Sequence, residues 1–235
     1  DRDIPLWLNT AMTKVVDSRG KVLGVEVIRN GRPVRIQARK AVILAAGGFE
    51  HNQEMREQYL PQPTDHSWSA GTKDNTGDAI REGIRLGAKM HRMNEAWWCN
   101  TISVPGEEIP RLSIMEKSYP GSIVVNPAGE RFSNESQNYM AFQQETFEKH
   151  TEENPCNPSW QIFDANFRAT YFVGPLYNSK FLPDWAVPKR YEEEGFFAKA
   201  ETISELARKI SVDVAGLEDT VRKMNGYARK GEDPD

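Results

Sequence analysis

Alternating apolar and polar residues dominate the first 46 positions and predict β-structure. Two alternating runs, KVLGVEVIR (21–29) and PVRIQARKAVIL (33–44), flank the dipeptide Asn30-Gly31. That dipeptide is typical of a two-residue hairpin, because both central positions adopt positive φ. Residues 41–46 are apolar throughout, which is typical of a strand buried on both faces. The pattern therefore predicts an antiparallel meander that leads into a buried strand.

Beyond about residue 60 the pattern becomes longer and less regular. TGDAIREGIRLGAKM (76–90) has the spacing of an amphipathic helix, and Asp78 lies in its first turn, where a negative charge suits the helix dipole. SIVVNPAGERFSNE (122–135) predicts two strands joined by a turn. The fold class is accordingly α+β: an antiparallel meander followed by an α+β region, with the boundary expected near residues 52–65.

Two helices are predicted near the C-terminus. TISE (202–205) is a capping box that opens the helix ISELARKI. GLEDTVRKMNGYARK (216–230) is a second helix, with Leu217, Val221 and Met224 on one face.

Composition excludes several classes of function. A net charge of −4 offers no basic stripe for a phosphate backbone, which argues against a nucleic-acid partner. No apolar run approaches the roughly 20 residues of a membrane helix. The two cysteines form no CxxC motif, so a reduced, cytoplasmic setting is favoured over a disulfide framework. The four histidines lack metal-ligand spacing, so no metal site is expected.

The stretch AVILAAGGFEHN resembles the end of a strand that meets a nucleotide. Gly47 and Gly48 allow a close backbone approach to a ligand, although a simple tight turn explains a Gly-Gly pair equally well. The loop G-x-G-x-x-G that accompanies such a strand is not in the sequence. Aromatic residues crowd the second half, where they suit either an ordinary core or a flat apolar pocket.

Four stretches together resemble the family of FAD-dependent fumarate reductases and 3-ketosteroid dehydrogenases. They are VILAAGGFEHN, NTGDAIREGIRLGA, PGSIVVNPAGERFSNES and LEDTVRKMNGYARKGEDPD, in the family's order. The resemblance implies a central segment of a longer protein, whose missing flanks carry the glycine-rich loop. It implies part of an FAD-binding domain at 1–55, a substrate-binding cap at 56–220, and the start of the return to the FAD domain at 221–235.

The resemblance also implies a set of residues that contact FAD. Asp78 corresponds to the family's FAD-contacting aspartate, and a plain role at the helix start is compatible with that role. The backbone of Met12 is expected to contact the adenine. The full set implied to bind the cofactor is Met12, Ala46, Gly47, Gly48, Gly77 and Asp78.

The two branches of the family differ in their catalytic residues. A fumarate reductase needs cationic groups for two carboxylates and an arginine proton donor. The matching positions here are Cys99, Met115, Ser118 and Tyr139, so a dicarboxylate substrate is not expected. NESQNY instead resembles the N-E-S-x-x-Y pattern of the ketosteroid dehydrogenases, which implies that Tyr139 takes a proton from the substrate. A structural hydroxyl in the pocket wall is the alternative, and Arg131 is interpreted as structural.

The predicted function is desaturation of a carbon–carbon bond beside a ketone in a steroid-like substrate, with FAD as hydride acceptor. A tyrosine has a reference pKa of about 10, so a tyrosine base has to be tuned or hydrogen-bonded. One alternative is a reductase-like flavoprotein acting on another enone or small acid, and another is a non-catalytic module that binds a hydrophobic ligand. The isolated chain is expected to show little FAD binding and no turnover. The steroid, the ring position, the electron acceptor and the oligomeric state stay open.

Overall fold

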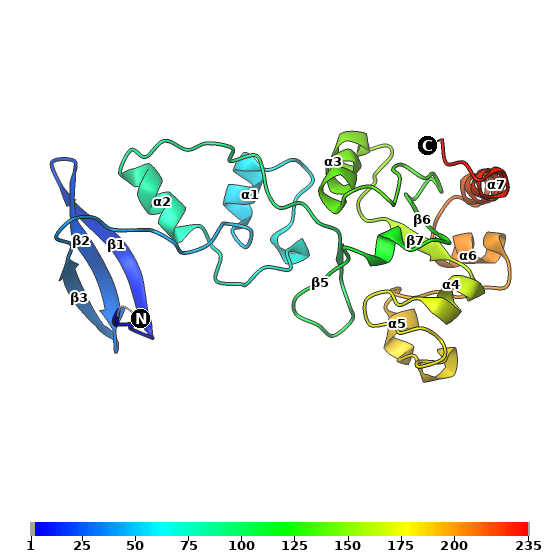
Figure 1. The fold of residues 1–235 in the computed structure, drawn as a ribbon, viewed down its shortest axis with the longest axis horizontal. Coiled ribbons are helices and arrows are strands. Elements are labelled where there is room, and N and C mark those ends of the chain that lie inside the picture. Colours follow the sequence, from blue (N-terminus) through cyan, green and yellow to red (C-terminus); the bar gives the residue numbers. More distant parts are fainter. Residues whose placement is uncertain (1–2, 235) are drawn as a thin grey trace. The chain divides into compact units, whose positions relative to one another are not determined.

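A three-stranded antiparallel sheet begins the chain. The computed structural model describes residues 3–234, and the sheet consists of β1 (Thr10–Ser18), β2 (Lys21–Arg29) and β3 (Arg32–Gln37), in that order (Figure 1). Asn30 and Gly31 have φ values of 51° and 75°, so the predicted hairpin is confirmed. The predicted meander is therefore present as far as residue 37.

The prediction of a buried strand at 41–46 is wrong for this chain. These residues form no strand within the described part of the chain, and the side chain of Ile43 is 89% exposed. A strand needs a neighbour that takes up its backbone hydrogen bonds. None of the three sheets in residues 3–234 supplies that neighbour, so the apolar run forms no strand and five of its six residues are exposed.

Two short helices follow, α1 (Gln53–Tyr59) and α2 (Asp78–Arg85). The helix predicted over 76–90 is confirmed in position but is shorter. Gly87 has a φ of 81°, and the N–H of Ala88 donates to the carbonyl of Gly83 at 2.9 Å. A left-handed glycine with such a bond ends a helix, which explains the early stop.

The predicted strand–turn–strand over 122–135 is half confirmed. β6 (Ser122–Val125) forms, but its partner is β7 (Trp160–Phe163), and the returning segment makes only a single bridge between Val125 and Arg131. On that side of β6 the Val124 N–H donates to a carboxylate oxygen of Glu135 at 2.7 Å. A side chain thus occupies a backbone position that a second strand would take.

The capping box at Thr202 is confirmed in its main feature. The Thr202 hydroxyl oxygen accepts from the N–H of Glu205 at 3.2 Å and starts α6 (Ile203–Lys209). The Glu205 carboxylate accepts from the N–H of Glu201 at 3.3 Å, one residue before the cap. Reciprocal bonding of this kind satisfies backbone donors that a helix start leaves without partners.

The last helix, α7 (Val214–Lys230), closes the main hydrophobic core. Leu217 is fully buried, and Val221 and Met224 pack against the same cluster, as predicted for one face of this helix. The buried members come from β6, β7, α6 and α7 and the segment between the two helices: Ile123, Val125, Ile162, Ala207, Ile210, Val212 and Leu217.

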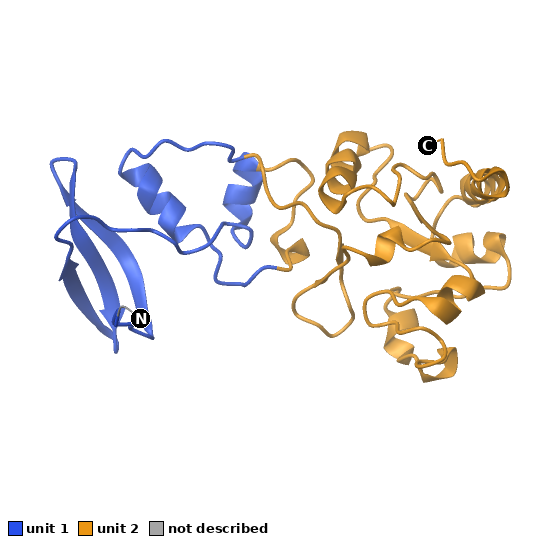
Figure 2. Ribbon diagram, viewed as in Figure 1, with its two compact units in different colours: residues 1–59, 71–93 blue, residues 60–70, 94–235 orange. Residues whose placement is uncertain are grey.

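The chain divides into two compact units (Figure 2). Unit 1 consists of residues 1–59 and 71–93, and unit 2 of residues 60–70 and 94–235. No helix within residues 3–234 is long and apolar enough to cross a bilayer. The other elements of unit 2 are β4 (Thr101–Ile102), β5 (Arg111–Leu112), α3 (Tyr139–Lys149), α4 (Ala165–Thr170) and α5 (Lys189–Glu193), with short 3-10 turns at His66–Trp68, Glu116–Ser118 and Asp184–Ala186.

Candidate functional site

Three glycines implied to contact FAD lie on two segments of unit 1 that are bonded together. The N–H of Gly77 donates to the carbonyl of Gly48 at 2.9 Å, and the N–H of His51 donates to the carbonyl of Asn75 at 3.1 Å. We call Gly47, Gly48 and Gly77 the glycine cluster. The fold therefore brings the AAGGF and TGD stretches side by side although they are far apart in sequence.

Two members of the glycine cluster, Gly47 and Gly77, have backbone angles and surroundings that favour glycine. A Cβ on Gly77, whose φ is 80°, would lie 2.5 Å from the sulfur of Met55. A Cβ on Gly47, whose φ is 77°, would lie 2.1 Å from the side-chain oxygen of Asn75. Both contacts are far below van der Waals distance, and both φ values favour glycine. The tight-turn interpretation thus explains Gly47 and Gly77 without a ligand.

Asp78 is the first residue of α2 and is exposed. The N-cap is Gly77, which offers no side chain, so Asp78 contributes to the helix start through its charge in the first turn. Its carboxylate forms an ion pair with Arg81 at 2.5 Å and accepts from the Thr76 hydroxyl at 3.2 Å. The Asp78 carboxylate can accept hydrogen bonds from hydroxyl groups of a ligand. The backbone N–H groups in the first turn of α2 can donate hydrogen bonds to acceptor groups of the same ligand.

Met12 and Ala46 are the two implied FAD contacts outside the glycine cluster. Met12 lies in β1 opposite Val27, immediately before a register shift that ends at Lys14. Ala46 is exposed and lies in the apolar run 41–46. Both belong to unit 1, but within residues 3–234 no backbone hydrogen bond joins either to the glycine cluster.

Tyr139 lies in unit 2, where it is the first residue of α3. Asn138 caps this helix, because its side-chain oxygen accepts from the N–H of Met140 at 2.8 Å. The Tyr139 side chain is half-buried, and its phenol oxygen accepts from the indole N–H of Trp97 at 2.8 Å. A capped helix start and a side-chain donor together define where this oxygen lies.

A buried lysine holds the loop that leads to Tyr139. The Lys117 ammonium donates to the carbonyls of Glu135 and Gln137 at 2.7 and 2.8 Å and to the Ser118 hydroxyl at 3.1 Å. Burial lowers the pKa of Lys117, and the nearby Glu135 carboxylate acts in the opposite direction. All three ammonium donors are used, so the NESQN loop has a fixed path to α3.

The same loop is held from its other side by a buried ion pair. Arg131 bonds the Glu135 carboxylate at 2.7 Å and both carboxylate oxygens of Asp233 at 2.8 and 2.9 Å. Burial disfavours the charged guanidinium, but the bonds from Asp233 and Glu135 outweigh it and raise the pKa of Arg131. These contacts agree with the interpretation of Arg131 as structural.

The positions at which a reductase would bind carboxylates carry no cation. The Cys99 thiol donates to the carbonyl of Asn100 at 3.3 Å, and burial raises its pKa, so it stays protonated. Met115 is exposed, and the Ser118 hydroxyl donates to the Glu135 carbonyl at 2.8 Å. Within residues 3–234 no cluster of three His, Cys, Asp or Glu side chains is arranged to hold a metal ion.

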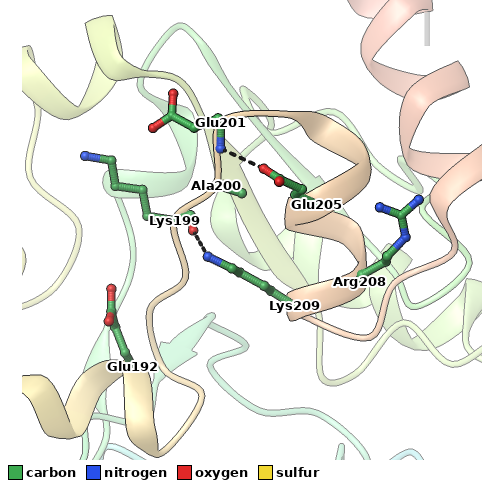
Figure 3. Close-up of a pocket in the computed structure, with 7 residues that line it drawn as sticks. All are labelled: Glu192, Lys199, Ala200, Glu201, Glu205, Arg208 and Lys209. Atoms are coloured by element: carbon green, nitrogen blue, oxygen red, sulfur yellow. Dashed lines mark hydrogen bonds between the residues drawn. The ribbon is translucent and has the colours of Figure 1, made fainter.

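A surface hollow of about 590 Å³ in unit 2 does not fit the predicted chemistry (Figure 3). It is formed by α6 and the segments before it, and none of the predicted site residues lines it. Its walls carry three acidic and three basic side chains, which do not suit an apolar substrate. The residues are Glu192, Lys199, Ala200, Glu201, Glu205, Arg208 and Lys209.

Sequence reasoning missed two of the residues that surround Tyr139. Trp97 is one of the aromatic residues of the second half, which suit either a core or a pocket, and its side chain is 78% exposed. Lys117 carried no signal, because a single lysine in a polar stretch is indistinguishable from a surface residue. Their bonds reach across 42 and about 20 positions of sequence, and spacing does not reveal such contacts.

Comparison with known proteins decides the family. A family model described as an FAD binding domain matches residues 1–235. The chain belongs to this FAD-binding family. It is 36% identical to a 3-oxosteroid 1-dehydrogenase of Mycolicibacterium smegmatis and 34% identical to a 4-oxocyclohexanecarboxylate 2-dehydrogenase of Sinomonas cyclohexanicum, over 99% and 93% of its length. The resemblance to FAD-dependent ketosteroid dehydrogenases is therefore confirmed.

A solved structure shows the same fold. The crystal structure of 3-ketosteroid delta1-dehydrogenase from Sterolibacterium denitrificans, in complex with 1,4-androstadiene-3,17-dione, matches 99% of this chain with a TM-score of 0.90 and 41% identity. The chain covers 42% of the length of that crystallised protein. It covers 41% of the 3-oxosteroid 1-dehydrogenase and 36% of the 4-oxocyclohexanecarboxylate 2-dehydrogenase. The family and its cofactor, FAD, are thus shown for the chain, which spans less than half of these proteins.

Proposed function

We propose that the chain is the central part of a longer FAD-dependent 3-ketosteroid dehydrogenase and supplies the residue that takes a proton from the substrate. The observation that carries this proposal is the match to a steroid-bound dehydrogenase over 99% of the chain, combined with the hydrogen-bonded phenol oxygen at the start of α3. The enzyme introduces a double bond beside a ketone in a steroid-like substrate. The chain is the central segment, with the cap at 56–220 and parts of the FAD domain on either side.

In the proposed reaction Tyr139 acts as the base. Its phenolate oxygen takes a proton from the carbon beside the ketone and becomes a phenol, and the electron pair of that C–H bond forms the new double bond. The neighbouring carbon loses hydrogen with its electron pair, and FAD supplies the two-electron acceptor for that hydride. The substrate thus loses one proton and one hydride and gains one carbon–carbon double bond.

Unit 1 is proposed to hold the cofactor through the glycine cluster and Asp78. The exposed carboxylate suits a hydroxyl of the nucleotide, and the start of α2 suits an acceptor group. Met12 and Ala46 remain part of the proposed contact set. The chain alone lacks most of the length of its relatives, so we expect weak FAD binding and no turnover from it.

The two alternatives have less support. A reductase acting on a small acid needs cations, and the side chains of Cys99, Ser118 and Tyr139 supply none. A purely binding module does not explain a phenol oxygen held by both a helix start and an indole donor. We also propose a cytoplasmic setting, which the two free thiols, Cys99 and Cys156, support.

Tyr139→Phe in the longer, FAD-loaded protein tests the proposal. We expect steroid desaturation to fall about 100- to 10,000-fold, because the general base is lost, while the flavin absorption spectrum is unchanged. Desaturation at the unaltered rate would contradict the role of Tyr139. Assays with a 3-ketosteroid and with 4-oxocyclohexanecarboxylate distinguish the substrates of the two types of relative, and we expect the uncharged steroid to react faster.

A further inference from the structure

We infer that Trp97 is a positioning residue for Tyr139: its indole N–H orients the oxygen that accepts the substrate proton. This inference rests on the proposed function. The contact is a direct hydrogen bond of 2.8 Å between the indole nitrogen and the phenol oxygen. It joins a loop residue to the first residue of a helix, from positions 42 residues apart.

The direction of this hydrogen bond is fixed by chemistry. An indole nitrogen is a donor only, so the phenol oxygen has to be the acceptor. The phenol proton is therefore left to point elsewhere, where a second group can remove it. A donor aimed at an oxygen stabilises that oxygen most when it is negatively charged. The contact therefore holds the oxygen that is proposed to take the proton.

The loop that carries Trp97 is anchored to the same helix as Tyr139. Trp98 is buried and packs edge-to-face on Phe147 of α3, with the ring centres 5.1 Å apart. Next to it, the Thr101 hydroxyl donates to the carbonyl of Trp68 at 3.0 Å, and β4 pairs with β5. One helix thus contacts Trp98 near its C-terminal end and receives the Trp97 hydrogen bond at its start.

Hydrophobic packing does not explain why a tryptophan lies at position 97. Its side chain is 78% exposed, so it stabilises the fold by burial far less than Trp98 does. Trp185, also in unit 2, is 88% exposed and makes no hydrogen bond to Tyr139. Trp97 therefore differs from a similarly exposed tryptophan by the single interaction that involves the proposed base.

The first test is kinetic and uses the longer, FAD-loaded protein. In Trp97→Phe we expect kcat to fall about 10- to 100-fold, because a hydrogen bond to a charged group is lost. KM should change less than about threefold, because an aromatic ring is kept. Trp185→Phe is the matched control and should leave kcat and KM unchanged.

A shape-preserving variant separates the N–H from the ring. Replacing Trp97 with the sulfur isostere of tryptophan, benzothienylalanine, keeps the bicyclic ring but removes the donor. We expect it to reproduce the lowered kcat and the nearly unchanged KM of Trp97→Phe. A normal kcat in this variant would overturn the inference, as would a Trp97→Phe effect that persists unchanged in a Tyr139→Phe background.

A second readout needs neither flavin nor turnover. In the ¹⁵N-labelled chain, Tyr139→Phe should shift the indole N–H signal of Trp97 and leave that of Trp185 in place. An unmoved Trp97 signal would overturn the inference. Failure of the proposed function looks different: if Tyr139→Phe desaturates steroid normally, the base assignment fails, whatever Trp97 does. If Tyr139→Phe is inactive but the isostere is normal, only the inference fails.

Discussion

Unit 2 contains hydrophobic clusters of its own, whereas unit 1 contains none within residues 3–234. In unit 2, Val125, Phe142 and Leu217 have no measurable exposure, and the three hydrophobic clusters all belong to it. Both units also carry apolar side chains that are more than 80% exposed, Leu6 and Ile43 in unit 1 and Phe181 and Trp185 in unit 2. Contiguous exposed apolar side chains are typical of a surface that another part of a protein covers. The comparison indicates that unit 2 is the more self-sufficient of the two.

Polar contacts, rather than a large core, hold the parts of unit 1 together. The N–H of Val15, on the edge strand β1, donates to the Glu82 carboxylate at 2.7 Å, and its carbonyl accepts from Arg85 at 2.6 Å. One helix therefore takes up both backbone groups of an edge residue. Covering an edge in this way prevents it from pairing with another chain.

The largest expected effect is in unit 2, from removal of its buried cation. Arg131→Met leaves the buried Glu135 carboxylate without its charge partner, so the free energy of unfolding should fall by about 3–5 kcal/mol. Denaturant unfolding followed by tryptophan fluorescence measures this, because five of the six tryptophans, all except Trp7, lie in unit 2. Arg222→Met is the control, since its ion pair with Asp219 is exposed, and it should cost less than about 1 kcal/mol. An equal loss of unfolding free energy in Arg131→Met and Arg222→Met would contradict the greater contribution assigned to the buried ion pair.

A smaller, pH-dependent effect is expected in unit 1. The hydrogen bond from Arg85 lowers the pKa of Glu82, the Val15 N–H adds to this, and burial opposes it. Since the pKa of Glu82 in the folded chain lies below the ordinary glutamate value of 4.5, the carboxylate stabilises the fold above that pH. The stabilisation is lost as the pH falls through the lowered value.

Glu82→Gln should therefore lower the stability of unit 1 by about 1–2 kcal/mol at pH 7, and the difference from the unaltered chain should disappear in acid. Hydrogen exchange of the Val15 amide at several pH values reports on it. Asp74→Asn, at an exposed loop position of unit 1, provides the control. A difference that does not depend on pH would show that the Glu82 charge is not responsible.

The smallest effect is expected at the exposed apolar run. Ile43→Lys should change the unfolding free energy of this chain by less than about 0.5 kcal/mol, because the side chain gains almost no burial on folding. In a longer protein that covers residues 41–46, the same substitution should cost several times more. Thermal unfolding of both proteins measures the contrast, and marked destabilisation of this chain alone would show that the run is buried after all.

Local chemistry was predictable from sequence, and long-range pairing was not. The Asn30-Gly31 turn and the Thr202 cap depend on neighbouring residues, and both are present. The strand expected at 41–46 depends on a neighbouring strand, which no local pattern reports. The prediction of a second strand directly after β6 is wrong for a related reason, because the Glu135 carboxylate accepts the hydrogen bond from the Val124 N–H.

The residues of the candidate site also divide into those that sequence motifs identify and those that only tertiary contacts reveal. The family motifs identified Tyr139, the glycine cluster and Asp78, and the structure shows that Gly48 and Gly77 are bonded to each other. Their roles toward FAD and substrate stay predictions. The bonds of Trp97 and Lys117 to the region of Tyr139 arise from tertiary folding, so only the three-dimensional arrangement reveals them.

The bond between Arg131 and Asp233 also has a consequence for the order of events during synthesis. The two residues are 102 positions apart, whereas Glu135 follows Arg131 by only four. At about 5–20 residues per second, a ribosome needs roughly 5–20 seconds to add the intervening segment. During that interval the guanidinium has one carboxylate partner instead of two. The loop before Tyr139 therefore reaches its final arrangement only after residue 233 has left the ribosome.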